Sequence, residues 1–170
     1  MNCVDWTYLQ EHVYFCDGSW RDIYVQNASA EDWRIWVDFV NERYRIDWYN
    51  GKSDKDEEQI DFDIILQFWQ GDPSLCSTAR VFVEHIQINA HFFTSDEIEN
   101  DIDPREFKCI EDHQKLMDYL TAISTLLQRP VVVTPEDFPE MILIEVIGEK
   151  IEIVNDLDPP KWIELVGNKP

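Results

Sequence analysis

Two segments of the chain carry apolar residues at helical spacing. Between residues 30 and 44 the apolar positions recur every three or four residues, at Trp33, Trp36, Val37, Val40 and Tyr44. Ser29 precedes them, and its side chain can accept a hydrogen bond from the backbone N–H of Asp32, which predicts a capped helix. A second stripe lies within residues 111–128 and ends before Pro130, which predicts a second helix that stops there.

Other segments alternate between apolar and polar residues or are short apolar runs, and both patterns predict strands. The predicted strands are 13–16, 19–25, 44–48, 60–69, 80–93, 131–133, 141–147 and 150–154. A change of phase near Glu84 or His85 predicts a β-bulge within the long strand 80–93. Asp17-Gly18 predicts a hairpin turn between the first two strands, while Trp6, Leu9 and Val13 also fit a helix, so both alternatives stay open there.

The order of these elements predicts the fold class. Strands outnumber helices, and most connections between strands are too short for a crossover. We therefore expect an α+β fold, with a mostly antiparallel sheet and two helices packed on one face. The length of 170 residues fits a single domain over 1–170. We expect a flexible acidic loop over about 50–59 and a separate C-terminal segment, 156–170, around the Pro159-Pro160 break.

The charge balance narrows the classes of partner. Asp and Glu number 35 against 14 Lys and Arg, which gives a formal net charge of −21. Such a chain lacks the excess of basic residues that binds phosphate backbones or anionic lipid, so neither nucleic acid nor a membrane surface is an expected partner. Hydrophobic residues make up 44% and aromatic residues 13%, which distinguishes the chain from a disordered acidic tail.

The cysteines and the N-terminus bear on the compartment. Residues Met1 to Trp6 lack the basic stretch followed by an apolar stretch that is typical of a secretory signal. No window of the sequence approaches the 18 consecutive apolar residues of a membrane-spanning helix. The four cysteines match no zinc-binding spacing. We therefore expect a cytoplasmic protein with reduced thiols and no cofactor.

One acidic segment is the leading candidate for a binding site. If residues 95–103 are extended, Glu97, Glu99, Asp101 and Asp103 point to the same face. Neighbouring carboxylates repel, so such a row is solvated or lies beside a cation or a basic partner. No basic residue lies between Thr94 and Pro104. The acids of the predicted loop, Asp54, Asp56, Glu57 and Glu58, are candidates for the same partner surface.

A metal-dependent enzyme is the alternative. The carboxylates at 96–103, followed by Glu106-Phe107-Lys108, loosely match the acidic ligands and lysine of metal-dependent hydrolases and nucleases. The match is weak, because that tripeptide should lie on a buried strand and the negative field would repel a nucleic acid. No nucleophile elbow, phosphate-binding glycine loop or paired-histidine motif occurs, and we name no catalytic or metal-binding residue.

Four apolar residues are predicted to lie away from the expected core faces. Ile35 and Phe39 lie opposite the tryptophan stripe of the first helix, and Ile65 and Trp69 lie opposite the main phase of the 60–69 strand. Another part of the chain covers them, or they form an interface in a homodimer or a complex. Both interpretations stay open.

Three function hypotheses follow. The first is a small acidic binding protein that docks on a basic protein partner, as inhibitors and immunity-type proteins do. The second is the metal-dependent hydrolase or nuclease. The third is a structural or adaptor domain whose charge serves solubility only.

Overall fold

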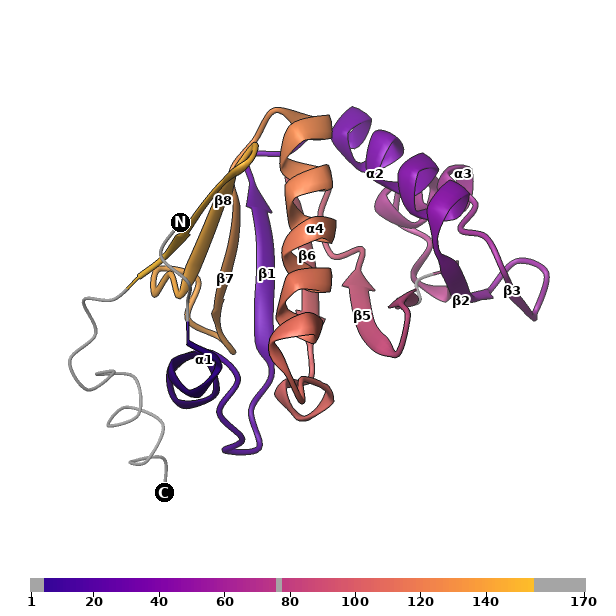
Figure 1. The fold of residues 1–170 in the computed structure, drawn as a ribbon. Helices are drawn as coiled ribbons and strands as arrows, with labels where there is room; N and C mark the ends of the chain where they lie inside the picture. Colours follow the sequence, from indigo (N-terminus) through magenta and orange to yellow (C-terminus); the bar gives the residue numbers. More distant parts are fainter. Residues whose placement is uncertain (1–4, 76–77, 155–170) are drawn as a thin grey trace, which may run out of the picture.

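The structure is a computed structural model that describes residues 5–75 and 78–154. Within these residues the chain forms one nine-stranded antiparallel sheet and four α-helices (Figure 1), which confirms the predicted α+β class. The helices are α1 (Trp6–His12), α2 (Ala30–Arg43), α3 (Phe62–Trp69) and α4 (Ile110–Leu127), with 3-10 turns η1 (Pro73–Leu75) and η2 (Pro104–Glu106). The strands are β1 (Arg21–Gln26), β2 (Arg45–Asn50), β3 (Lys55–Glu57), β4 (Ala79–Val83), β5 (Ile86–His91), β6 (Glu97–Ile102), β7 (Val131–Pro135), β8 (Ile144–Ile147) and β9 (Lys150–Ile153). Their order across the sheet is β3-β2-β4-β5-β6-β1-β7-β8-β9.

Helices α2 and α4 pack over one face of the sheet, as Figure 1 shows with α4 in front of β1 and β6. Their apolar stripes were both predicted correctly. The side chain of Ser29 accepts from Asp32 N, and Asp32 in turn accepts from Ser29 N, which closes the expected cap. Trp33 and Trp36 are fully buried and meet edge to face with ring centroids 5.4 Å apart. The ring of Trp33 also lies 5.1 Å from that of Phe92, just after β5, so aromatic packing helps to hold α2 on the sheet.

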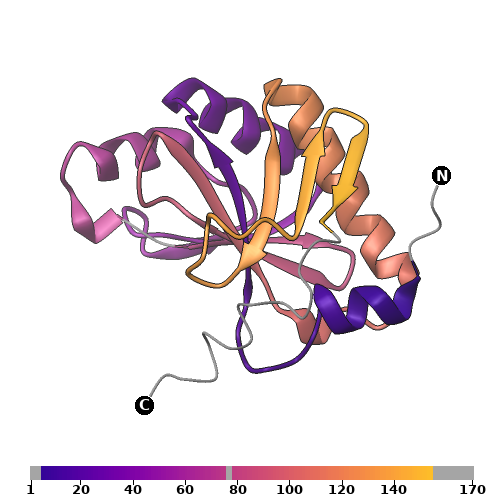
Figure 2. The same ribbon diagram turned by 90° about the vertical axis from the view of Figure 1, so that its left-hand side faces the viewer.

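The two shorter helices extend this layer at its ends. Beyond α1, Tyr14 lies against His113 of α4, and on α3 the ring of Trp69 lies 6.0 Å from that of Trp33. Figure 2, viewed from the β9 edge, shows that the sheet is twisted and that the helices pack over it. No helix in the described part of the chain is long and apolar enough to span a membrane.

The predicted strand over 60–69 is wrong, because residues 62–69 form α3. The side chain of Asp61 accepts from Asp63 N at 3.0 Å and caps this helix. The segment alternates in polarity, but Phe62, Ile65 and Trp69 also lie at helical spacing. In an apolar run this short, the helical and the strand period both fit the apolar positions. The cap formed by Asp61 favours the helix.

The predicted bulged strand over 80–93 is instead a hairpin of β4 and β5. Val83 pairs with Ile86, so Glu84 and His85 form a two-residue turn. Glu84 adopts a φ of +56°, which a two-residue turn requires and a regular strand does not. The change of phase in the sequence therefore marks the turn rather than a bulge.

The first predicted strand, residues 13–16, does not form, and the preceding residues 6–12 form α1. The side chain of Asp17 accepts from both the backbone N–H and the hydroxyl of Ser19, and Gly18 has a φ of +92°. The Asp-Gly pair therefore makes a turn as expected, but it joins a loop to β1 and not one strand to another.

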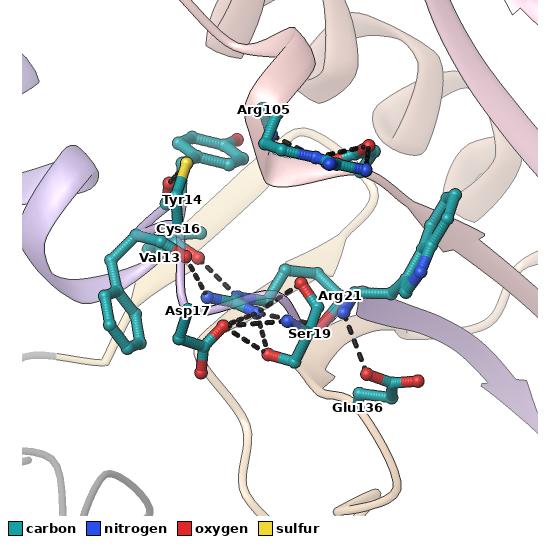
Figure 3. Close-up of polar contacts among 11 residues, drawn as sticks. Val13, Tyr14, Cys16, Asp17, Ser19, Arg21, Arg105 and Glu136 are labelled. Atoms are coloured by element: carbon teal, nitrogen blue, oxygen red, sulfur yellow. Dashed lines mark hydrogen bonds and ion pairs between the residues drawn. The ribbon is translucent and has the colours of Figure 1, made fainter.

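Arg21 gives the physical reason for this loop (Figure 3). Its guanidinium, which is fully buried, donates to the carbonyl oxygens of Val13 at 2.6 Å, Phe15 at 2.7 Å and Trp20 at 2.8 Å. Arginine offers five donors in a fixed fork, so one side chain can hold this loop against the start of β1.

The remaining predictions are mostly confirmed. Strands β2 and β7 and the β8–β9 hairpin form where expected, with Gly148 at a φ of +57° between the last two. The acidic stretch 50–59, predicted as a loop, contains β3, which pairs with β2. Asn50 stabilises the intervening turn by accepting from Lys52 N and Ser53 N. The predicted C-terminal segment 156–170 lies outside the described residues.

Candidate functional site: a carboxylate-rich sheet face

Strand β6 lies in the middle of the sheet, between β5 and β1. Ile98, Asn100 and Ile102 are buried on the helix side of the sheet. By alternation, Glu97, Glu99 and Asp101 project from the opposite face, and each is half-buried. The predicted one-sided spacing is thus present for three of the four acids, on the central strand β6.

The neighbouring strands add further polar side chains to this face. Asp101 lies opposite Asp22 of β1 and Asn89 of β5, and Glu99 lies opposite Tyr24 and His91 in the same way. We call this set the carboxylate face: Asp22, Tyr24, Asn89, His91, Glu97, Glu99 and Asp101. It forms two adjacent rows that run across three central strands.

Asp101 has polar partners on β5. Asn89 Nδ2 donates to one of its carboxylate oxygens at 2.6 Å, and His91 Nε2 lies 2.5 Å from the other. The other ring nitrogen of His91 lies 3.2 Å from Thr78 Oγ1. These contacts fix the orientation of the His91 ring.

Asp22 is held by neutral donors. Tyr24 donates its hydroxyl to Asp22 at 3.0 Å, and the backbone N–H of Asp137 donates to the same oxygen at 2.9 Å. Asp22 is only 7% exposed. A carboxylate this buried that is held by a hydroxyl and an amide keeps most of its charge uncompensated.

Burial and mutual repulsion disfavour the charged forms of these acids. Burial is the main cause that raises the pKa of Asp22, Glu97 and Glu99, and neighbouring carboxylates raise each one further. Burial alone would lower the pKa of His91, but the hydrogen bond to Asp101 and the charges of Asp101 and Glu99 raise it above its usual value. Within residues 5–75 and 78–154, no Lys or Arg forms an ion pair with Asp22, Glu97 or Glu99.

Asp103, the fourth predicted member of the row, lies outside the carboxylate face. It caps η2 by accepting from Arg105 N, and its carboxylate pairs with the Arg105 guanidinium at 2.7 Å. The hydrogen bond from the Arg105 side chain is the main cause that lowers the pKa of Asp103. Its charge is therefore already satisfied within the chain.

The acids of the 50–59 segment lie at a different place on the sheet. They are on or beside β3, which is four strands away from β6, or about 19 Å at the usual strand spacing. Asp54 accepts from Tyr49, and Glu57 accepts from Asn50 and Ser53. Asp56 and Glu58 are exposed nearby. The structure thus separates the two acidic groups that the sequence analysis had joined.

The four apolar candidates lie in the helix layer. Ile65 is fully buried in the core, and Ile35, Phe39 and Trp69 are partly buried and packed against it. Trp69 also donates its ring N–H to Phe92 O at 2.9 Å. Contacts within this chain account for much of the burial of these side chains, and an interface that includes their exposed parts stays a prediction.

Two observations bear on the metal-dependent alternative. In the described part of the chain, no group of three or more His, Cys, Asp or Glu side chains is arranged to hold a metal ion. Glu106 lies in η2 and not on a strand, and its carboxylate accepts from Gln87 N at 2.7 Å. Cys16 and Cys109 are free thiols, and Cys3 and Cys76 lie outside the described residues.

Sequence reasoning missed four members of the carboxylate face: Asp22, Tyr24, Asn89 and His91. Asn89 and His91 occupy the less buried positions of the alternating strand β5, and Asp22 and Tyr24 alternate with the apolar Ile23 and Val25 in the sequence of β1, which are signals that the sequence does contain. Those signals do not reveal which strands are neighbours. Only the pairing of β1 and β5 with β6 brings these side chains beside the acidic row.

No family model, curated protein or solved structure matches this chain.

Proposed function

We propose that this chain is an acidic binding protein that docks on a basic protein partner through the carboxylate face. Inhibitors and immunity-type proteins that neutralise a basic enzyme are the class that this profile fits. In such complexes a negative surface attracts its partner over a distance and fixes its orientation.

One observation carries the proposal. Asp22, Glu97 and Glu99 lie close together on adjacent central strands, half-buried or buried, and no salt bridge to Lys or Arg holds any of them in the described residues. Their ionised forms cost free energy in this position, as their raised pKa values indicate. A partner that brings ammonium or guanidinium groups would stabilise the ionised forms and recover that free energy on binding.

An exposed aromatic residue beside the face supports the same conclusion. Phe93 follows β5 and is 60% exposed, the largest exposed fraction among the large hydrophobic residues of the described chain. Its ring stacks on His91 with centroids 5.2 Å apart and planes 4° apart. Aromatic residues next to charged side chains are typical of protein interfaces, and an aromatic ring can also stack against a partner arginine.

A charge-matched pair of variants tests the proposal. Glu97→Gln/Glu99→Gln removes two charges from the carboxylate face, whereas Asp38→Asn/Glu42→Gln removes two exposed charges from α2, on the helix layer. Each form would be immobilised and exposed to an extract of the native host, and captured proteins would be eluted with salt. We expect the wild type and the α2 variant to retain the same basic protein and the face variant to lose it.

Binding kinetics with that captured protein complete the test. At low salt the association rate of the face variant should fall about tenfold or more, and the wild-type rate should decrease steeply with ionic strength. The α2 variant controls for net charge, because it changes the total by the same two units. Equal association rates for both variants would show that total charge, and not the carboxylate face, is what the partner recognises.

A further inference from the structure

His91 is the one basic side chain in the carboxylate face, and groups from every adjacent strand surround it. From β6, Asp101 contacts its Nε2 at 2.5 Å and Glu99 lies directly opposite. The negative charge of Asp22 on β1 helps to raise the pKa of His91. Thr78, just before β4, contacts its Nδ1. Phe93 stacks on the ring. The nearest cation on β4, Arg80, lies opposite Asn89 and pairs with Asp47 at 3.0 Å.

The ring can change its charge without losing its contacts. In the neutral form, Nε2–H donates to Asp101 and Nδ1 accepts from the Thr78 hydroxyl. In the protonated form, Nδ1–H donates to Thr78 Oγ1 instead, because a hydroxyl oxygen both donates and accepts. Protonation therefore adds a positive charge at a fixed point of the face and leaves the strand geometry in place.

We propose that the protonation of His91 sets the pH range over which the carboxylate face binds its basic partner. The neutral ring leaves the negative charges of Asp101, Glu99 and Asp22 to attract the partner's cations. The protonated ring neutralises Asp101 and repels an approaching ammonium or guanidinium group. Binding therefore weakens as the pH falls and His91 takes up its proton. This inference rests on the function proposed above.

Linkage fixes the sign of the effect. A partner cation beside His91 favours the neutral ring, so the pKa of His91 is lower in the complex than in the free protein. Affinity is complete above the pKa of the free protein and decreases as the pH falls through it. Since Asp101 and Glu99 raise that pKa despite burial, the transition lies above the pH at which an exposed histidine titrates.

The experiment uses a deca-lysine peptide as a defined basic probe of the full chain. The His91 ring signals would be followed by NMR from pH 5 to 9, with and without the peptide, in low salt. We expect the peptide to lower the pKa of His91 by about one unit, which corresponds to a tenfold coupling. The ring signals of His12, which lies on α1 and contacts Tyr8 O, are the internal control for nonspecific contact with the peptide.

Peptide affinity at pH 6 and pH 8 gives the second readout. The wild type should bind about threefold to tenfold more weakly at pH 6, as that coupling requires. His91→Gln should bring the ratio of the two affinities close to one. An unshifted His91 pKa, or a full pH effect in His91→Gln, would overturn the inference while leaving the function intact. Binding that depends equally on Glu97/Glu99 and on Asp38/Glu42 would instead overturn the proposed function.

Discussion

His113 and His91 lie on opposite sides of the same sheet, and their pKa values shift in opposite directions. His113 of α4 is 6% exposed, and Tyr14 contacts its Nδ1 at 2.8 Å. Burial lowers its pKa to about 4. His91 is also partly buried, yet the adjacent carboxylates raise its pKa. The comparison shows that burial alone keeps a histidine neutral, whereas burial beside carboxylates favours its charged form.

The same contrast extends to the two sides as a whole. The helix side contains the aromatic core of Trp33, Trp36 and Trp48, each fully buried. The carboxylate face holds charges that neutral donors or a single histidine satisfy incompletely. We therefore expect substitutions on the helix side to change stability strongly. Substitutions on the carboxylate face should mainly change binding and the response to pH.

The largest expected effect comes from truncating the aromatic core. Trp36→Ala should lower the free energy of unfolding by about 3–5 kcal/mol, because it removes a fully buried ring and leaves a cavity. Phe93→Ala, on the other side of the sheet, should change it by less than about 0.5 kcal/mol. Urea unfolding of both variants measures the difference. Similar losses for the two would show that the ring of Phe93 is packed as the core is.

The sequence predicted the helix side better than the carboxylate face, for a physical reason. Helices α2 and α4 are long enough for the helical period to be unambiguous, and Ser29 and Pro130 mark an end of each. Helix α3 is only 8 residues long, and its alternating polarity equally fits a strand. Long amphipathic elements are determined locally, while short apolar runs depend on their caps and on tertiary packing.

The candidate site shows the same limit. The alternation of Glu97, Glu99 and Asp101 is local, and their common face was predicted. The contacts of Asp101 with His91 and of Asp22 with Tyr24 require the order of strands β5, β6 and β1, which joins distant parts of the chain. Asp103 lies outside the predicted row because the backbone enters η2 at Pro104, where Asp103 caps the turn and pairs with Arg105.

An intermediate effect is expected from acid titration of His113. Its folded pKa of about 4 lies below the unfolded value of 6.5, so the folded state favours the neutral ring. This contribution to stability is complete above the unfolded pKa and is lost as the pH falls toward 4, by a total of about 3 kcal/mol. His113→Gln should remove that part of the acid sensitivity. Urea unfolding at pH 7, 5.5 and 4.5 compares the two forms, and parallel losses would contradict the assignment.

The smallest expected effect concerns Glu99 in the absence of a partner. Its folded pKa is raised, so the ionised form destabilises the folded state above that pKa, and the cost disappears as the pH falls and the carboxyl takes up a proton. Glu99→Gln should therefore stabilise the free protein at pH 8 by about 0.5 kcal/mol. The effect is small because the side chain is partly solvated and water screens the repulsion. The gain should be smaller at pH 4.5, because lowering the pH favours the protonated form of Glu99, and in about 300 mM NaCl, which screens repulsion between neighbouring carboxylates. Asp38→Asn, an exposed carboxylate on α2, is the matched control and should show a smaller gain. Thermal unfolding under these three conditions measures the difference, and a destabilised Glu99→Gln would mean that the Glu99 carboxylate makes a favourable contact that the proposed docking face does not predict.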